Sequence, residues 1–276
     1  MFREATIADW ERLEPFYRHI YREGHPLQNK AFWDWQYGDA THGRAFIFIG
    51  DDGQVLGHVG GYFCHDIAWM INGYLDPAYR GKGVMSNLYS LAREYHPMAA
   101  TAANSLGLGM YHSMGWIRYY DLVRYVKTNP MIATPDLETV CQPIVADVDQ
   151  LVVKDSHYFR QPGIKAIRFA DGSTGVSQEN VGGLRIVDIE NLAELEASAW
   201  QAGYLWIDYI TSWNDRKTQL LERSGWKRDY ETAVPWRLNP LIAGYYCDIT
   251  FLSEEPLDKK LIVHRSFSDH GRIGSL

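Results

Sequence analysis

Cysteine is scarce in this chain and does not occur in close pairs. The three cysteines, Cys64, Cys141 and Cys247, are widely spaced, and none belongs to a C-x-x-C motif. This excludes a disulfide framework or a zinc site built on close cysteine pairs, and it favours reduced thiols within a folded core. The ten histidines are scattered and show no H-E-x-x-H spacing, so the sequence predicts no metal site.

Long apolar runs and an excess of positive charge are also missing. No run approaches the ~20 apolar residues that a membrane-spanning helix needs. The first residues, Met1–Glu4, lead into a charged segment without an apolar signal core, so we expect a cytoplasmic protein with no membrane partner. The formal net charge of −7 argues against a nucleic-acid partner. The chain has neither a G-x-S-x-G nucleophile motif nor a complete dinucleotide or P-loop glycine motif.

What the sequence does contain indicates two α/β domains. A length of 276 residues exceeds one ordinary domain, and 46% hydrophobic with 22% charged residues is typical of globular proteins. Alternating and helical apolar patterns predict strands and helices in mixed order. The strands expected in the first half are 2–7, 45–50, 54–63, 67–75, 98–103 and 119–126, with helices beginning near 8 and 84.

A glycine-rich turn joins a strand to a helix near the middle of the first half. The strand ends at Leu75-Asp76-Pro77, and Arg80-Gly81-Lys82-Gly83-Val84-Met85 follows, leading into the apolar pattern of a helix. Glycines let a ligand approach the backbone closely, and the bare amides of a helix N-terminus attract anions. Arg80 and Lys82 add positive charge suited to phosphate oxygens. The turn is therefore a candidate phosphate site.

A second motif follows that helix and the next strand. It runs from Asn104 through Gly107 and Tyr111 to Gly115 and Trp116. Together the two motifs resemble the signatures of the GNAT superfamily of N-acyltransferases, written R/Q-x-x-G-x-G/A and N-x-x-A-x-x-L-Y-x-x-x-G-F. Gly107 replaces the alanine of the second signature, and Met85 stands where the first has glycine or alanine.

The resemblance implies a fold, a cofactor and a set of site residues. The fold would be a mixed, mainly antiparallel GNAT sheet with a splayed parallel strand pair, and the co-substrate would be acetyl-CoA. The amide of Leu75 would stabilise the oxyanion, Tyr111 would protonate the leaving thiolate, and His65 or Asp66 would be candidates for the base. The acceptor would be a small-molecule or peptide amine. The cofactor-binding residues would be Leu75, Arg80, Gly81, Lys82, Gly83, Val84, Met85, Asn104, Gly107 and Tyr111.

The second half carries a degenerate copy of this pattern. Asn214, Gly225 and Trp226 match Asn104, Gly115 and Trp116 at one offset (214 − 104, 225 − 115 and 226 − 116). The same offset places Leu221 opposite Tyr111 and Glu190 opposite Arg80. We therefore expect a catalytic domain at 1–128, a linker at 127–130, and a GNAT-like domain at 131–276 without a pyrophosphate turn.

The residues leave other functions open. One alternative is a tandem GNAT-like transferase that uses another acyl donor, and another is a catalytically silent module that binds CoA or a partner. The acceptor, the general base, the length of the acyl chain and the oligomeric state are not determined by the sequence. The aromatic segment with Trp33, Trp35 and Tyr37 is a candidate wall of the acceptor site, although a core role fits each residue equally well.

Overall fold

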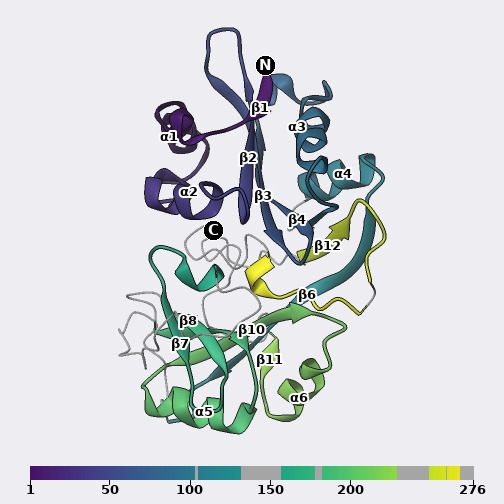
Figure 1. The fold of residues 1–276 in the computed structure, drawn as a ribbon. Helices are drawn as coiled ribbons and strands as arrows, with labels where there is room; N and C mark the ends of the chain where they lie inside the picture. Colours follow the sequence, from purple (N-terminus) through teal and green to yellow (C-terminus); the bar gives the residue numbers. More distant parts are fainter. Residues whose placement is uncertain (103–104, 132–156, 178–181, 229–248, 259, 268–276) are drawn as a thin grey trace. The chain divides into compact units, whose positions relative to one another are not determined.

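The structure, a computed structural model, describes residues 1–102, 105–131, 157–177, 182–228, 249–258 and 260–267 (Figure 1). It consists of two compact units, neither of which is one continuous stretch of chain. Unit 1 comprises Met1–Tyr119, Ile249–Lys259 and Phe267–Leu276, and unit 2 comprises Tyr120–Asp248 and Lys260–Ser266.

Unit 1 contains a six-strand run with the order β1-β2-β3-β4-β5-β12. Neighbouring strands are antiparallel except for β4 and β5, which are parallel. This confirms the predicted mixed, mainly antiparallel sheet. The strands are β1 (Phe2–Glu4), β2 (Gly43–Ile49), β3 (Val55–Cys64), β4 (Ile67–Leu75), β5 (Met98–Ala102) and β12 (Ile249–Ser253).

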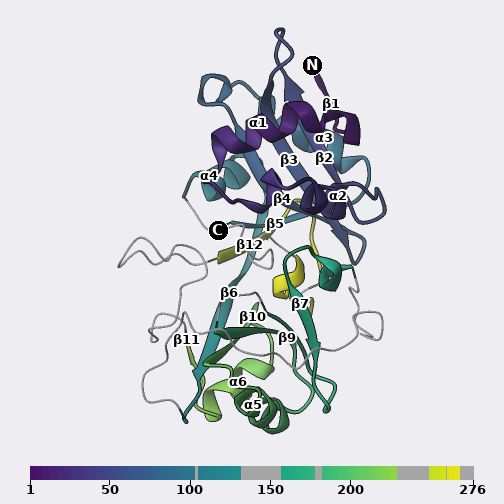
Figure 2. The same ribbon diagram turned by 90° about the vertical axis from the view of Figure 1, so that its left-hand side faces the viewer.

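Helices cover both faces of this sheet. In Figure 1, α1 (Trp10–Ile20) and α2 (Lys30–Tyr37) lie on one side of the strands, and α3 (Val84–Arg93) and α4 (Ser105–Ser113) lie on the other. Figure 2 views the unit with α1 and α2 in front of the strands. Successive side chains of β2 point to opposite faces of the sheet. Ala45 and Ile47 therefore pack with α1 and α2, and Phe46 packs with α3. Pro15 lies within α1, which continues on both sides of it.

The parallel pair β4/β5 separates along its length. Pairing covers Ala68–Met98, Trp69–Ala99 and Met70–Ala100, whereas β4 continues to Leu75. The β3/β4 register shifts nearby, between His58 and Gly60. The splayed strand pair predicted from the sequence is therefore present, and it exposes one edge of the last residues of β4.

Unit 2 also contains a run of strands with one parallel pair, and its described α-helices pack in a single core. Its strand order is β6-β10-β9-β8-β7, with β11 paired to β6, and β9 and β10 are parallel. Helices α5 and α6 contribute to one apolar core, which includes Leu195 and Leu221. In the parts of the chain that the structure describes, no helix has the length and apolarity to cross a bilayer. The elements are β6 (Ile117–Thr128), β7 (Lys165–Arg168), β8 (Thr174–Ser177), β9 (Gly183–Asp188), α5 (Leu192–Gln201), β10 (Trp206–Ser212), α6 (Lys217–Arg223) and β11 (Lys227–Arg228).

The units differ from the expected division at 128/131. Strand β6 pairs with β10 as far as Thr128, and the next residue, Asn129, is buried and donates from its side chain to the Tyr204 carbonyl at 3.0 Å. The prediction of a linker at 127–130 is thus wrong for residues 127–129, which lie in β6 or are buried directly after it. Conversely, β12 pairs with β5 of unit 1. The residue pattern of a single strand does not reveal which distant strand it will pair with. The sequence therefore could not show that β6 pairs with β10 or that β12 pairs with β5.

Candidate active site

The glycine-rich turn of unit 1 presents open backbone at the start of α3. Gly81 and Gly83 have φ angles of 72° and 74°, and a β-carbon at either position would meet no atom within 4 Å. Gly83 is the N-cap residue and supplies no side chain to the first turn. The amides there keep their capacity to bind an anion. Val84 is buried, and Met85 packs against the core, so the methionine does not fill the turn.

Arg80 is fixed next to this turn. Its Nε donates to the carbonyl of Leu75 at 3.1 Å, and its guanidinium lies 5.9 Å from the centre of the Tyr74 ring. Lys82 lies over the Tyr79 ring at 5.4 Å. The bond through Nε leaves the terminal nitrogens of Arg80 for an anion, in the planar geometry that suits phosphate oxygens.

The end of β4 directs a backbone amide to the separated edge. The amide of Asp76 donates to the carbonyl of Leu56, at the β3 side, at 2.8 Å. Successive residues of a strand direct their amides to opposite sides. The amide of Leu75 therefore points away from β3, toward the edge from which β5 has separated. This is the orientation that an oxyanion donor requires.

Two tyrosine hydroxyls lie beside the same edge. The hydroxyl of Tyr111 shares a 2.8 Å hydrogen bond with that of Tyr89, and the Tyr111 ring packs against Trp116 at 4.5 Å. A β-carbon on Gly73 would lie 3.9 Å from the Tyr89 hydroxyl, which places the pair next to β4 beyond its pairing with β5. Sequence reasoning missed Tyr89, because it occupies the apolar face of α3 and carries no signal that separates it from a core residue.

The structure does not bring His65 and Asp66 to this place. They form the exposed two-residue turn between β3 and β4, with φ angles of 55° and 57°. Such positive angles are typical of tight hairpin turns. The eight residue steps from Ile67 to Leu75 separate this turn from the other end of β4 by roughly 26 Å. Neither side chain can therefore act on a group beside Leu75.

A buried polar network supports the irregular part of β4 instead. His58 bonds the Asn72 carbonyl through Nδ1 and the Tyr17 hydroxyl through Nε2, both at 3.0 Å. Because a carbonyl only accepts, Nδ1 carries the proton and Nε2 accepts from Tyr17. Trp33 donates to the Tyr17 hydroxyl, and Tyr37 donates to the Asn72 side-chain oxygen. Trp33 and Tyr37 are thus core residues, and burial lowers the pKa of His58 to about 4 despite its bond to Asn72.

The remaining predicted residues belong to α4 and the segment before it. Gly107 lies within α4, half-buried, on the same helix as Tyr111. Asn104 lies outside the described residues. The cofactor-binding candidates that the structure describes thus lie on three segments: the end of β4, the turn into α3, and α4.

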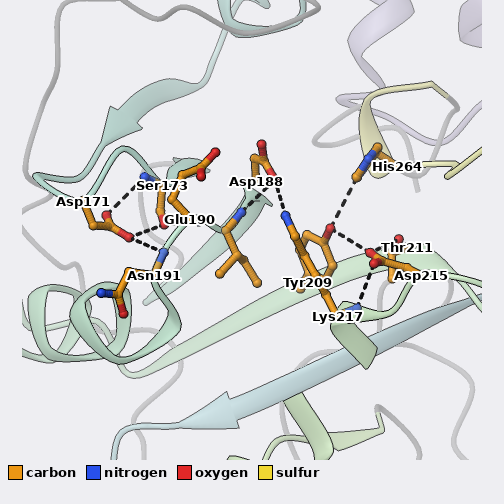
Figure 3. A network of polar contacts seen from close by, with 11 residues as sticks. Asp171, Ser173, Asp188, Glu190, Asn191, Tyr209, Thr211, Asp215, Lys217 and His264 are labelled. Atoms are coloured by element: carbon orange, nitrogen blue, oxygen red, sulfur yellow. Dashed lines mark hydrogen bonds and ion pairs between the residues drawn. The ribbon is translucent and has the colours of Figure 1, made fainter. Parts of the chain in front are cut away.

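The corresponding turn of unit 2, from β9 to α5, is filled by its own side chains (Figure 3). The carboxylate of Asp171 accepts from the Asn191 amide at 3.0 Å, and the hydroxyl of Ser173 accepts from the Glu190 amide at 2.9 Å. The side chain of Asn191 then caps α5 by accepting from the Glu194 amide. Amides that would face a phosphate are therefore bonded within the chain, next to acidic groups that repel one.

In unit 2 an ion pair joins the end of β9 to the start of α6. Lys217, the first residue of α6, makes a 2.7 Å ion pair with Asp188, the last residue of β9 (Figure 3). Leu221, the counterpart of Tyr111, is fully buried in the core. The described turn from β9 to α5 is thus not open, and unit 2 has a leucine at the position that corresponds to Tyr111.

Comparison with known families accounts for the architecture of unit 1. Residues 7–116 match the model of the acetyltransferase (GNAT) family. This segment is similar to GNAT domains. Comparison of the sequence with curated proteins gives no match.

Solved structures extend the likeness of fold to nearly the whole chain. A presumed acetyltransferase from Pyrococcus horikoshii has a TM-score of 0.56 at 15% identity, covering 92% of this chain and 88% of that one. A tandem GNAT protein from the clavulanic acid biosynthesis pathway has a TM-score of 0.51 at 12% identity, covering 94% and 99%. A GCN5-related N-acetyltransferase from Sphaerobacter thermophilus has a TM-score of 0.50 at 12% identity, covering 92% and 95%. The fold is therefore that of tandem GNAT-like proteins.

Proposed function

We propose that unit 1 is an N-acetyltransferase that takes an acetyl group from acetyl-CoA and transfers it directly to a primary amine. The observation that carries the proposal is the convergence, beside the unpaired end of β4, of an open glycine turn, an amide donor and a pair of tyrosine hydroxyls. The GNAT match over residues 7–116 supports the reaction class.

The turn and Arg80 fit the pyrophosphate of CoA. The space beside Gly81 and Gly83 lets phosphate oxygens reach the amides at the start of α3, and Arg80 and Lys82 neutralise their charge. The thioester then lies along the separated edge of β4. In this position the amide of Leu75 donates to the carbonyl oxygen as negative charge develops on it.

Proton transfer would use the tyrosine pair. The amine nitrogen forms a bond to the carbonyl carbon, the carbon–sulfur bond breaks, and the hydroxyl of Tyr111 gives its proton to the departing thiolate. The bond between Tyr111 and Tyr89 provides a route for restoring that proton. The amine releases its own proton to water, since His65 and Asp66 lie at the other end of β4 and His58 is fully buried.

Two measurements test the proposal. Calorimetric titration of the full chain with acetyl-CoA should give one site per chain, because the turn of unit 2 is filled; two equivalent sites would contradict this assignment. A panel of primary amines incubated with acetyl-CoA should yield a product heavier by one acetyl group in mass spectrometry. Longer acyl-CoA donors in the same panel test the alternative of another acyl group.

One observation favours the silent binding module as a second candidate. Tyr111 is only 6% exposed and is bonded to another side chain, as a purely structural tyrosine would be. Binding of acetyl-CoA without acetylation of any amine in the panel would support that candidate.

A further inference from the structure

Three arginines of unit 2 surround one buried carboxylate on the face of the sheet away from α5 and α6. Asp208 of β10 lies between Ile207 and Tyr209, which both pack in the core with these helices, so alternation directs Asp208 to the opposite face. There its carboxylate bonds Arg124 of β6 at 2.6 Å and Arg265 at 2.5 Å. Arg185 of β9 lies 3.9 Å from the same carboxylate.

Among the described residues, this arrangement carries more positive than negative charge. One carboxylate is shared by three guanidinium groups, and in the described part of the chain no other carboxylate pairs with Arg185 or Arg265. Burial lowers the pKa of Arg185 to about 10, an effect that the neighbouring Arg265 and Arg124 reinforce and Asp208 opposes. Asp208 shows the reverse response: burial would raise its pKa, but the arginines outweigh burial and hold it at about 2.

Arg265 also has buried donors that the described residues leave unused. Its Nε and Nη1 are inaccessible to solvent and find no acceptor among these residues, while Nη2 bonds Asp208. Buried guanidinium donors normally have partners, since leaving them unpaired costs the free energy of their lost hydration. Arg185 keeps 22% of its side chain exposed, the largest share among the three arginines.

We propose that Arg124, Arg185 and Arg265 form an oxyanion-binding site that takes a compact carboxylate or phosphate group. Guanidinium groups match both anions in geometry and charge, and the bound anion would offset the excess positive charge beside Arg185 and Arg265. Arg185, the most exposed of the three arginines, gives the anion its entrance. The site lies in unit 2 and goes beyond the acetyl transfer proposed for unit 1.

The test uses the full chain with sodium malonate or sodium phosphate, and with sodium chloride at equal ionic strength as reference. Either oxyanion should raise the thermal unfolding midpoint above the chloride value and give a calorimetric binding signal; comparison of the two salts shows which group is preferred. Arg265→Gln and Arg185→Gln should each weaken binding at least tenfold. The matched control, Arg223→Gln, removes an exposed arginine of α6 and should bind as the unaltered chain does.

Asp208→Asn should change anion binding in the opposite direction to the arginine variants. It removes the negative charge from the site, so the stabilisation by malonate or phosphate should become larger than in the unaltered chain. If Arg265→Gln does not fold, Arg185→Gln decides. The proposal is overturned if neither oxyanion stabilises the unaltered chain or Asp208→Asn more than chloride does, or if the folded glutamine variants bind as tightly as Arg223→Gln.

Discussion

Each unit has a turn that leads from a strand into a helix. The two turns differ in whether side chains of the protein bond their backbone amides. In unit 1, α3 begins at Gly83 with no side-chain cap and open space around the turn. In unit 2, α5 begins at Asn191, which caps the helix, while Asp171 and Ser173 accept from the neighbouring amides. A helix start binds an anion only while its amides remain unsatisfied. A few side chains therefore determine whether the amides of this turn are open to an anion.

The units also differ at the ends of their parallel strands. In unit 1 the strands β4 and β5 separate after Met70, beside the hydroxyls of Tyr89 and Tyr111. In unit 2 the ion pair of Lys217 with Asp188 joins α6 to the end of β9. The parallel strands of both units stop pairing before they end, but only in unit 1 do two tyrosine hydroxyls lie beside the unpaired edge among the described residues.

The largest expected effect concerns the tyrosine pair that distinguishes unit 1. Tyr111→Phe keeps the ring packing against Trp116 and removes the hydroxyl, so turnover should fall by about 10²- to 10⁴-fold with little change in acetyl-CoA affinity. The measurement is steady-state acetylation with chemistry shown to be rate-limiting. Tyr89→Phe is the matched variant and should cost less if Tyr111 is the direct donor; an equal or larger loss in Tyr89→Phe would transfer the acid role to Tyr89.

A second test reverses the charges at the two helix starts. Arg80→Glu should weaken acetyl-CoA binding by about 10- to 100-fold, since it replaces attraction to two phosphates by repulsion. Glu190→Arg places an arginine at the corresponding position of unit 2, yet calorimetry should still find one site, because the amides there are bonded to Asp171 and Ser173. A second site in this variant would show that charge alone separates the units.

The pH dependence of stability should also differ between the units. His58 of unit 1 has a folded pKa of about 4 against an ordinary value of 6.5, so its unfolded form gains the proton first as pH falls. Unit 1 should therefore lose on the order of 3 kcal/mol between pH 6.5 and 4. Asp208 of unit 2, with a pKa lowered to about 2 from 3.8, contributes stability that is lost only below about pH 3.8.

Hydrogen exchange resolved by segment, corrected for intrinsic rates, measures this difference in β3 and β10. His58→Gln should flatten the profile of β3 between pH 6.5 and 4 and leave that of β10 unchanged. Equal loss of protection in both strands over this range would contradict the assignment to His58.

The smallest expected effect distinguishes the cost of backbone strain at a glycine from its contribution to acetyl-CoA binding. Gly83 and Gly225 have similar φ angles, 74° and 81°, with open space around both, so alanine at either position should cost about 1–2 kcal/mol of stability. Only Gly83→Ala should also reduce acetyl-CoA affinity. If chemical denaturation gives similar losses and calorimetry gives equal affinities for both variants, backbone access at Gly83 is not important for binding.

Local patterns were sufficient to predict much of unit 1. Alternation identified β4 with its observed limits, Ile67–Leu75, and the glycine turn marked the start of α3. The roles of Tyr89 and His58 were missed because a polar atom on an otherwise apolar face becomes visible only when its bonding partner on another element is known. His65 and Asp66 were proposed from their nearness in sequence to β4, but an extended strand carries its two ends far apart.

The strand β12 has a consequence for how the chain is made. Its residues Ile249–Ser253 complete the sheet of unit 1 by pairing with β5, whose residues Met98–Ala102 are synthesised about 150 residues earlier. During translation the ribosome therefore releases β5 with an unpaired edge, and this edge stays exposed until almost the whole of unit 2 has emerged. Exposed strand edges pair readily with other chains, so we expect the nascent chain to be most prone to aggregation in this interval.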